Sequence, residues 1–283
     1  MSWPNWIFKR SDGKTLTFGN DSIAILYMKG IDELKVEVFK KKRAVGDGDI
    51  ITGYRIPSRE LEIGGEVVDP RMNKNMREIM NSFFSQRYTY DVYITYLGEQ
   101  RYAKSCRLLR YKCPPKNINI PAQPVVNMLC EDGYFLSIDE FGENLASTFG
   151  GSGFPYVNLV GKSRPFAYFL FGADVEINND GDADAHCKAV ITFRGSVVNP
   201  YIKKDGSFVK CLDSFSIGDT LVINSYDKSI TKNGVNISAK VDKGSRWNDL
   251  VFKIGANTIG YDADAGNNLM DVTIYFNKRH LGV

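Results

Sequence analysis

The sequence is poor in the residues that most often carry chemistry. It has two histidines, His186 and His280, and five cysteines, with no pair spaced Cys-x-x-Cys. An odd count without such a pair fits neither a disulfide framework nor a zinc site, so we predict reduced, partly buried thiols. Neither histidine lies in a nucleophile motif. His186 and Cys187 are neighbours in an expected strand and point to opposite faces, so they form no shared site.

Long apolar runs are absent as well. No run of about 18 apolar residues is present, so no helix is expected to span a membrane. Residues 1–6 lack a basic region followed by an apolar stretch, which is the pattern of a secretory signal. We therefore expect no membrane insertion, and synthesis in an aqueous, cytosol-like compartment.

Motifs for phosphate or metal binding are also missing. Residues 150–153 are rich in glycine but lack the lysine and helix of a phosphate-binding loop, and we interpret them as a linker. Two acidic clusters alternate like calcium ligands but lack the spacing of an EF-hand loop, and we interpret them as turns. They comprise Asp47 and Asp49, and Asp180, Asp182 and Asp184. No carboxylate pair stands out for sugar hydrolysis. We predict no enzyme, no cofactor, and no catalytic, cofactor-binding or metal-binding residue.

The residues that are abundant favour strands. Hydrophobic residues make up 43% of the chain and charged residues 24%, which is ordinary for a folded protein. The 15 Tyr, 17 Phe and 26 Gly favour strands joined by tight turns. Charge is uneven: residues 1–131 hold 21 Lys+Arg and 15 Asp+Glu, whereas residues 132–283 hold 15 and 18. This asymmetry predicts two domains, 1–131 and 132–271. It does not assign residues 272–283 to either domain.

The first domain is expected to be β-rich with one helix. The helix is predicted over residues 69–84, with Asp69 as its N-cap and Pro70 at the first position. An apolar stripe at helical spacing is expected to pack on a sheet; it comprises Met72, Met76, Ile79, Met80, Phe83 and Phe84. Strands are predicted over residues 34–39, 50–56, 59–63, 88–96 and 101–113, the third ended by Gly64 and Gly65. Prolines in 117–130 favour an edge or crossing segment there.

The second domain is expected to be an antiparallel sandwich. After a glycine-rich loop at 142–153, short strands recur at even spacing with turn signals between them. They are predicted over residues 166–171, 188–193, 200–203, 208–212, 219–225, 229–231, 249–254 and 272–276.

Four ordered segments resemble the distal tail proteins of long-tailed (siphovirus-like) phages of Gram-positive bacteria. They are Arg-Glu-Leu-Glu-Ile at 59–63 before the helix; Val-Asn-Met-Leu-Cys-Glu-Asp-Gly-Tyr-Phe at 126–135; Gly-Ser-Val-Val-Asn-Pro-Tyr-Ile at 195–202; and the set at 217–224, 232–234 and 254–259. Each motif is short, but their order and spacing run through most of the chain.

The resemblance implies both an architecture and a function. It implies a mainly β fold: a ring-forming domain with one α-helix, then a galectin-like antiparallel β-sandwich. Six copies would form a ring hub at the distal tail tip or baseplate of the virion, between the tail tube protein and the tail-associated hub protein. The sandwich would support receptor-binding components. Genome DNA would cross the channel without specific binding, and synthesis would take place in the host bacterial cytoplasm.

One alternative stays open at this point. A sandwich with an exposed tryptophan can stack on a sugar ring, and Trp247 is the candidate in the second domain. The alternative function is therefore a carbohydrate-binding tail protein that contacts host cell-wall sugar.

Overall fold

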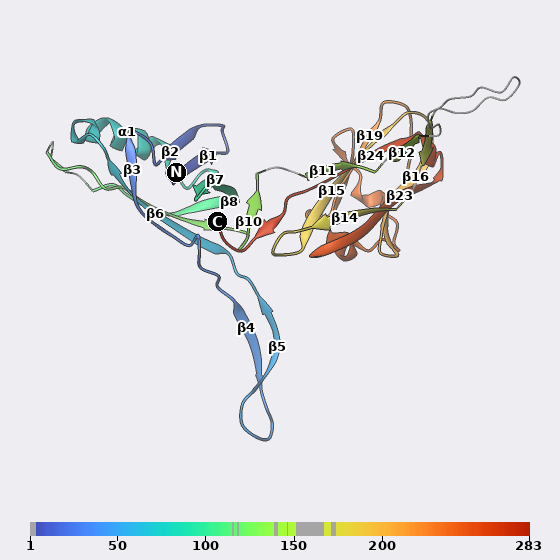
Figure 1. The fold of residues 1–283 in the computed structure, drawn as a ribbon, viewed down its shortest axis with the longest axis horizontal. Coiled ribbons are helices and arrows are strands. Elements are labelled where there is room, and N and C mark those ends of the chain that lie inside the picture. Colours follow the sequence, from blue (N-terminus) through green and yellow to red (C-terminus); the bar gives the residue numbers. More distant parts are fainter. Residues whose placement is uncertain are drawn as a thin grey trace, which may run out of the picture. The chain divides into compact units, whose positions relative to one another are not determined.

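The protein divides into two compact units. The computed structural model describes residues 4–114, 116–117, 119–138, 141–145, 147–150, 167–170 and 174–283. The N-terminal unit comprises Met1–Ile138 together with Arg279–Val283, and the C-terminal unit comprises Asp139–Lys278 (Figure 1). The last five residues of the chain therefore fold with its beginning. Among the described residues, no helix has the length and apolar character needed to cross a membrane.

The N-terminal unit is a twisted antiparallel sheet with one helix beside it. Its elements are β1 (Asn5–Arg10), β2 (Thr15–Phe18), β3 (Ile23–Lys29), β4 (Glu37–Lys42), β5 (Asp49–Arg55), β6 (Arg59–Val67), the 3-10 turn Pro70–Met72, α1 (Asn73–Phe83), β7 (Thr89–Tyr96), β8 (Glu99–Lys112), β9 (Val125–Cys130), β10 (Phe135–Ser137) and β25 (Arg279–His280). The sheet runs β2-β1-β7-β8-β9-β6-β3, with β10 pairing β8 and β25. β4 and β5 pair only with each other.

Alternation along the strands builds the core of this unit. In β7, Tyr90, Val92 and Ile94 are buried while their neighbours are half-buried, as expected for a strand with one face on the core. Met80 and Phe83 of α1, with Phe84 behind them, pack into the same core. Phe84 lies edge-on to Phe8 at 5.5 Å between ring centroids, within the favourable range for aromatic pairs.

The predicted helix starts later and buries less than expected. Asp69 and Pro70 begin a 3-10 turn, Pro70–Met72, in which the Asp69 side chain accepts a hydrogen bond from the Arg71 backbone N–H, and α1 itself starts at Asn73. Met72 and Ile79 of the predicted apolar stripe are exposed instead of buried. Met80, Phe83 and Phe84 are buried and Met76 packs partly buried against the core, so only part of the stripe is covered.

Three details of the predicted strands were wrong. β6 continues through Gly64 and Gly65 to Val67. A side chain at Gly64 would collide with Tyr27, and one at Gly65 would collide with Ile23 and Phe18. Small residues are therefore needed at both positions for packing, not for a turn. Residues 125–130 form the central strand β9, because both prolines precede it. Leu109, expected inside, is exposed where the β8–β9 register shifts between Leu108 and Arg110.

The C-terminal unit is an antiparallel β-sandwich. Its strands are β11 (Phe141–Asn144), β12 (Ser147–Gly150), β13 (Ala167–Leu170), β14 (Val175–Asn179), β15 (Ala185–Phe193), β16 (Val197–Lys204), β17 (Ser207–Lys210), β18 (Ser214–Phe215), β19 (Thr220–Asn224), β20 (Ser229–Lys232), β21 (Val235–Asn236), β22 (Val251–Phe252), β23 (Gly255–Ala265) and β24 (Met270–Phe276). One sheet runs β11-β24-β15-β19-β20-β21 with β22 on β15, and the other runs β14-β23-β16-β17 with β18 on β16. β12 pairs with β13. Short 3-10 turns lie at Ser238–Lys240, Trp247–Asp249 and Asn267–Leu269.

The two sheets enclose a second, separate core. Alternate residues of β15 and β24 are buried, among them Ala189, Ile191, Val272 and Ile274. The predicted fold class is confirmed: mainly β, with one α-helix in the described part of the N-terminal unit, followed by the antiparallel sandwich. The predicted loop at 142–153 was wrong for its described residues, which lie mostly in β11 and β12; residues 151–153, 166 and 171 lie outside the described part.

Candidate assembly interface

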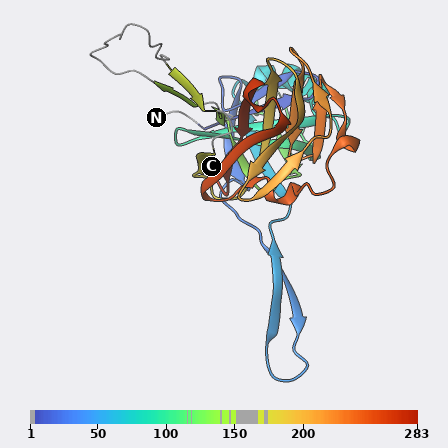
Figure 2. The ribbon, with the colours of Figure 1, turned by 90° about the vertical axis from the view of Figure 1, so that its right-hand side faces the viewer.

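The most unusual feature of the N-terminal unit is a hairpin arm, formed by β4 and β5 and the turn between them. In Figures 1 and 2 the arm stands away from the sheet of its own unit. No residue of either strand is buried. The exposed side chains include large apolar ones: Val38, Phe39, Ile50, Ile51 and Tyr54, the last at 77% exposure.

Both faces of the arm carry apolar groups. Val38 is opposite Tyr54 in the register, and the next position pairs Phe39 with Gly53. Because side chains alternate across a strand, Val38 and Phe39 point to opposite faces. An isolated two-stranded hairpin is marginally stable in water at best, and contiguous exposed apolar groups mark interaction sites. The arm therefore has the character of an element that is completed by a partner.

The basic residues Lys40, Lys41, Lys42 and Arg43 lie at the outer end of β4. The carboxylates Asp47 and Asp49 follow across the turn. Nearer the base, Arg55 donates a hydrogen bond to Glu37 at 2.6 Å, which ties the two strands together. The outer part of the arm thus combines apolar and charged groups of both signs, which is typical of a polar-rimmed contact surface.

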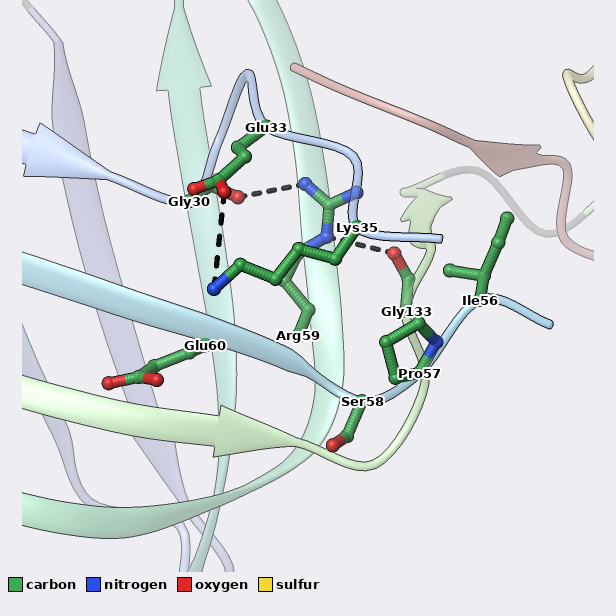
Figure 3. Close-up of a pocket in the computed structure, with 9 residues that line it drawn as sticks. All are labelled: Gly30, Glu33, Lys35, Ile56, Pro57, Ser58, Arg59, Glu60 and Gly133. Carbon is green, nitrogen blue, oxygen red and sulfur yellow. Dashed lines mark hydrogen bonds and ion pairs between the residues drawn. The ribbon is translucent and has the colours of Figure 1, made fainter. Parts of the chain in front are cut away.

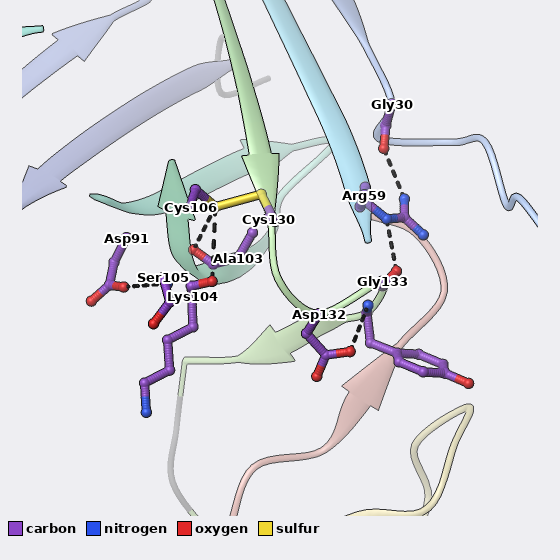
Figure 4. Close-up of a disulfide and its surroundings, with 11 residues drawn as sticks. Gly30, Arg59, Asp91, Ala103, Lys104, Ser105, Cys106, Cys130, Asp132 and Gly133 are labelled. Carbon is purple, nitrogen blue, oxygen red and sulfur yellow. Dashed lines mark hydrogen bonds between the residues drawn. A yellow bond between two sulfur atoms is a disulfide. The ribbon is translucent and has the colours of Figure 1, made fainter. Parts of the chain in front are cut away.

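Arg59 anchors the base of the arm. It is 6% exposed and donates to the carbonyl oxygens of Gly30 and Gly133, each at 2.8 Å (Figures 3 and 4). It also donates to a third carbonyl oxygen, that of Leu281, at 2.6 Å. Its guanidinium also lies 4.5 Å from the Phe135 ring centroid. Burial lowers the pKa of Arg59 below its ordinary value, but the group stays charged, as an arginine does in a protein.

The three carbonyls come from distant parts of the chain. Gly30 precedes the arm, Gly133 follows β9, and Leu281 is the third residue from the end of the chain. A side chain at Gly30, where φ is 85°, would meet the Glu60 carbonyl, and one at Gly133 would meet Ile56 and Pro57. Both glycines therefore allow the chain to approach closely enough for Arg59 to bind it.

A second arginine reinforces the C-terminal tail. Arg279 binds both carboxylate oxygens of Asp132, at 2.6 and 2.8 Å, and lies over the Tyr134 ring. Arg101 donates to the Gly282 carbonyl. The hollow beside the anchor, drawn in Figure 3, measures about 20 Å³, which is room for a water molecule and too small for a ligand. The anchor is therefore a structural clamp.

The prediction that all cysteines are reduced was wrong for one pair. Cys106 and Cys130 form a disulfide between β8 and β9 (Figure 4). Arg107 pairs with Leu129 in the register, so Cys106 and Cys130 face each other directly, with Cα atoms 4.0 Å apart. Cys113, Cys187 and Cys211 are free and buried, as predicted. Burial raises the pKa of the Cys187 thiol to about 12 and that of Cys211 to about 11.

The histidines and cysteines weighed as catalytic or metal-binding candidates do not lie together at one site. Cys187 is buried in the sandwich core, whereas the half-buried His186 lies edge-on to Tyr226 at 5.3 Å. His280 lies in β25, in the other unit. Within the described part of the chain, no three His, Cys, Asp or Glu residues are grouped to hold a metal ion. Trp247 packs partly buried against the sandwich core, which leaves less of its face for a sugar.

The side chains of the aromatic strand β7 and its partner β8 have two different roles. The inner side chains of β7 belong to the core, while Tyr93 stacks on Tyr102 of β8 at 5.2 Å. Both strands lie inside the sheet, so any contact with a neighbour would use their outer face. The arm was not predicted from sequence as a separate element, although its alternating residues 34–39 and basic cluster were visible there.

Comparisons with known proteins agree with this architecture. Residues 180–280 match the family model described as the C-terminal domain of the siphovirus-type tail component SPP1_Dit. The resemblance to distal tail proteins is confirmed. No curated protein matches the sequence.

Solved structures extend the likeness over both units. The crystal structure of the SPP1 Dit (gp 19.1) protein, described as a paradigm of the hub adsorption apparatus in phages that infect Gram-positive bacteria, aligns with a TM-score of 0.69 and 18% identity, over 97% of this chain and 98% of that one. A chain of the phage p2 baseplate, in its activated conformation with Sr, aligns with a TM-score of 0.58 and 11% identity over 99% of both chains. The form with Ca gives 0.56 and 12% over 100% of both. At these identities the structures establish the distal tail fold.

Proposed function

We propose that this chain is a non-enzymatic structural subunit of a phage tail tip or baseplate. Six copies form a ring hub that joins the tail tube protein to the tail-associated hub protein. The N-terminal unit, residues 1–138 with the C-terminal tail 279–283, builds the ring. The unit that contains the sandwich, residues 139–278, faces outward and supports receptor-binding components. The observation that carries this proposal is the arm, a hairpin with exposed apolar side chains whose strands pair only with each other among the described residues, in a protein with the distal tail fold.

A ring gives every arm a partner. In a head-to-tail contact the surface of one subunit meets a different surface of the next, and a rotation that closes leaves no arm uncovered. Covering side chains such as Ile51 and Tyr54 removes apolar area from water, which is the usual driving force for obligate assembly. The arm is then the part of each subunit that reaches its neighbour.

The mass of the purified protein in solution tests the ring. We expect the full chain to form a species of six times 31.8 kDa by light scattering. A variant in which residues 37–55 are replaced by a short Gly-Ser turn should stay monomeric. Because no residue of β4 or β5 is buried, the variant should stay folded and unfold cooperatively, at a lower temperature than the ring because the stabilisation by assembly is lost. An arm-deleted variant that still forms the ring would contradict the role of the arm.

Electron microscopy of tail particles tests the position. A label fused to the C-terminal unit is expected at the distal tip, outside the tube, in virions that have left the host cytoplasm where the protein is made. A label spaced along the tube, or at the head, would contradict the proposal. If genome DNA crosses the channel without specific binding, the isolated ring should retain no particular DNA sequence. A DNA-binding assay with the isolated ring tests this.

A second candidate function has one observation in its favour. The C-terminal unit has a hollow of about 290 Å³ at the outer face of β16 and β17. Tyr201 and Phe208 lie there with ring centroids 6.0 Å apart, next to the ion pair of Lys203 with Asp174 at 3.0 Å. Aromatic faces beside polar groups suit a sugar ring. Glycan-array binding that is lost in Phe208→Ala and retained in Trp247→Ala would favour a carbohydrate-binding tail protein; no binding would eliminate it.

A further inference from the structure

A groove of about 490 Å³ runs along the exposed side of α1. Its walls are the solvent-facing residues of the helix and the segment that connects β8 to β9. Four cationic side chains line it, Arg71, Lys74, Arg77 and Lys116, against a single carboxylate, Glu78. We propose that this groove binds an acidic peptide segment of a neighbouring protein.

The groove has a built wall. The Asn73 side chain donates to the carbonyls of Ile120 at 2.9 Å and Asn117 at 3.3 Å, and accepts from the Ala122 backbone N–H at 2.9 Å. One amide at the start of the helix thus holds the connecting segment in place along α1. The polar residues of the helix then follow at spacings of three and four, at positions 74, 77, 78 and 81, and form one continuous floor.

The charge of the groove selects an anionic partner. Arg71 has a partner in Asp69, at 3.1 Å, on the helix cap. Lys74, Arg77 and Lys116 remain as a cluster of three cations with Glu78 as the one opposing charge among the lining residues. All three side chains are exposed. Their attraction acts over about 8 Å at physiological ionic strength, so it steers an acidic segment into the groove and weakens as salt rises.

The remaining lining favours a peptide over a nucleic acid. None of the lining residues is aromatic, so the groove has no platform on which bases stack. Pro70, Pro114 and Ala122 supply apolar contact, and the Asn81 amide has a donor and an acceptor suited to a peptide backbone. The assignment of the partner to a neighbouring tail protein rests on the proposed function, whereas the binding of acidic peptide does not.

Fluorescence anisotropy of a labelled oligoglutamate peptide with the full chain tests the inference. We expect saturable binding that weakens steadily between about 50 mM and about 200 mM salt. The variant Lys74→Gln/Arg77→Gln/Lys116→Gln should weaken binding by about tenfold or more, because three ion pairs are lost. The charge-retaining variant Lys74→Arg/Arg77→Lys/Lys116→Arg should stay within about twofold.

A matched control separates the groove from charge in general. The variant Lys228→Gln/Lys243→Gln/Lys253→Gln removes three exposed cations from the C-terminal unit, none of them in the groove or the arm, and should change peptide binding by less than about twofold. Equal weakening in both Gln variants, or no binding by the unmodified chain, would overturn the groove as the site. Tighter binding of an oligothymidylate than of the peptide would overturn the assignment of the partner. Thermal unfolding of each variant confirms its fold, and the ring mass is measured separately.

Discussion

Arg59 is the side chain on which the base of the arm depends. It supplies the donors for carbonyl oxygens of Gly30, Gly133 and Leu281. Arg59→Met keeps the apolar stem but leaves these buried oxygens without that donor, and we expect the free energy of unfolding of the N-terminal unit to fall by about 3 kcal/mol. Urea unfolding followed by the fluorescence of the buried Trp6, in a Trp247→Phe background, measures the change.

A second substitution at Arg59 and a control at Arg107 separate the effects of geometry and of charge. Arg59→Lys keeps the charge but loses the planar fork, so it should have an intermediate effect. Arg107→Met removes a 60% exposed side chain that lies 3.7 Å from Glu131, and should change stability by no more than about 0.5 kcal/mol. An Arg59→Met effect as small as that of Arg107→Met would show that the three carbonyls find water instead.

Asp12 gives the N-terminal unit a specific response to acid. Arg10 donates two hydrogen bonds to its carboxylate, at 2.9 and 2.7 Å, and these lower the pKa of Asp12 from 3.8 to about 2. Because the folded pKa lies below the unfolded one, the carboxylate stabilises the fold above about pH 4, and this contribution is lost as the pH falls toward 2. The stability difference between the wild type and Asp12→Asn should therefore shrink over that range. A difference that stays constant would contradict the pKa.

Single residues also show where sequence reasoning ends. Met72 and Ile79 belong to the predicted apolar stripe, yet both are exposed, whereas Met80 and Phe83 of the same stripe are buried in the core. Gly64 and Gly65 were interpreted as the end of a strand, but they continue β6 where side chains from β2 and β3 press against it. In both cases the local pattern was correctly identified, and the outcome was decided by a neighbour from elsewhere in the chain.

At the scale of elements, the β8–β9 pair holds a prediction about the thiols. Under unfolding conditions without reductant, we expect three reactive thiols per chain, and five after reduction. In the folded protein the three free thiols should react slowly, because all are buried and burial raises their pKa. A thiol-reactive dye counts them directly. Five thiols without reductant would show that the disulfide is absent.

The contribution of the disulfide to the free energy of unfolding can be measured by urea unfolding. The disulfide links residues 24 apart, and its loss in Cys106→Ala/Cys130→Ala should cost about 3 kcal/mol through the entropy of the unfolded chain. This variant should show three thiols with and without reductant. The sequence did not reveal the pairing, because it depends on a strand register that includes an irregularity between Leu108 and Arg110.

Elements with strong local signals were predictable and others were not. The helix start carries a cap and a proline, and the structure has both in use. The long strand β23 was missed, because its sequence is rich in Gly, Ala, Asn and Asp, which are depleted in strands. It is held between β14 and β16 instead, with Ile259 and Tyr261 in the core. Its strand state comes from its neighbours.

At the scale of the whole molecule, the uneven charge of the sequence indicated two domains, and the structure has two separate hydrophobic cores. The assembly roles of the two units, ring and outward support, remain predictions, because they concern surfaces between chains. The arm illustrates the reason. Within the described part of the chain its two strands pair only with each other, so its contacts in an assembly are set by a second molecule.

The C-terminal tail is expected to stabilise the N-terminal unit, although it lies at the opposite end of the sequence. Arg279–Val283 folds with the N-terminal unit, through β25 paired with β10 and through contacts of Leu281 with Arg59 and Arg279 with Asp132. Deleting these five residues removes the Leu281 acceptor and the partner of Asp132. We expect faster hydrogen exchange in peptides of the N-terminal unit, near the arm base and β10, with exchange in the sandwich unchanged because its core is made entirely of residues before the tail.

The matched control for this deletion is a point substitution at Lys278, the residue just before the tail. Lys278→Ala removes an ion pair with Asp180 inside the C-terminal unit, at 2.6 Å, without touching the anchor. It should leave exchange in the N-terminal unit at the wild-type rate. If the deletion instead raised exchange equally in both units, the tail would be a shared support and the division at residue 279 would not describe how the chain unfolds. If it raised exchange in neither, Arg59 would hold the arm base through Gly30 and Gly133 alone.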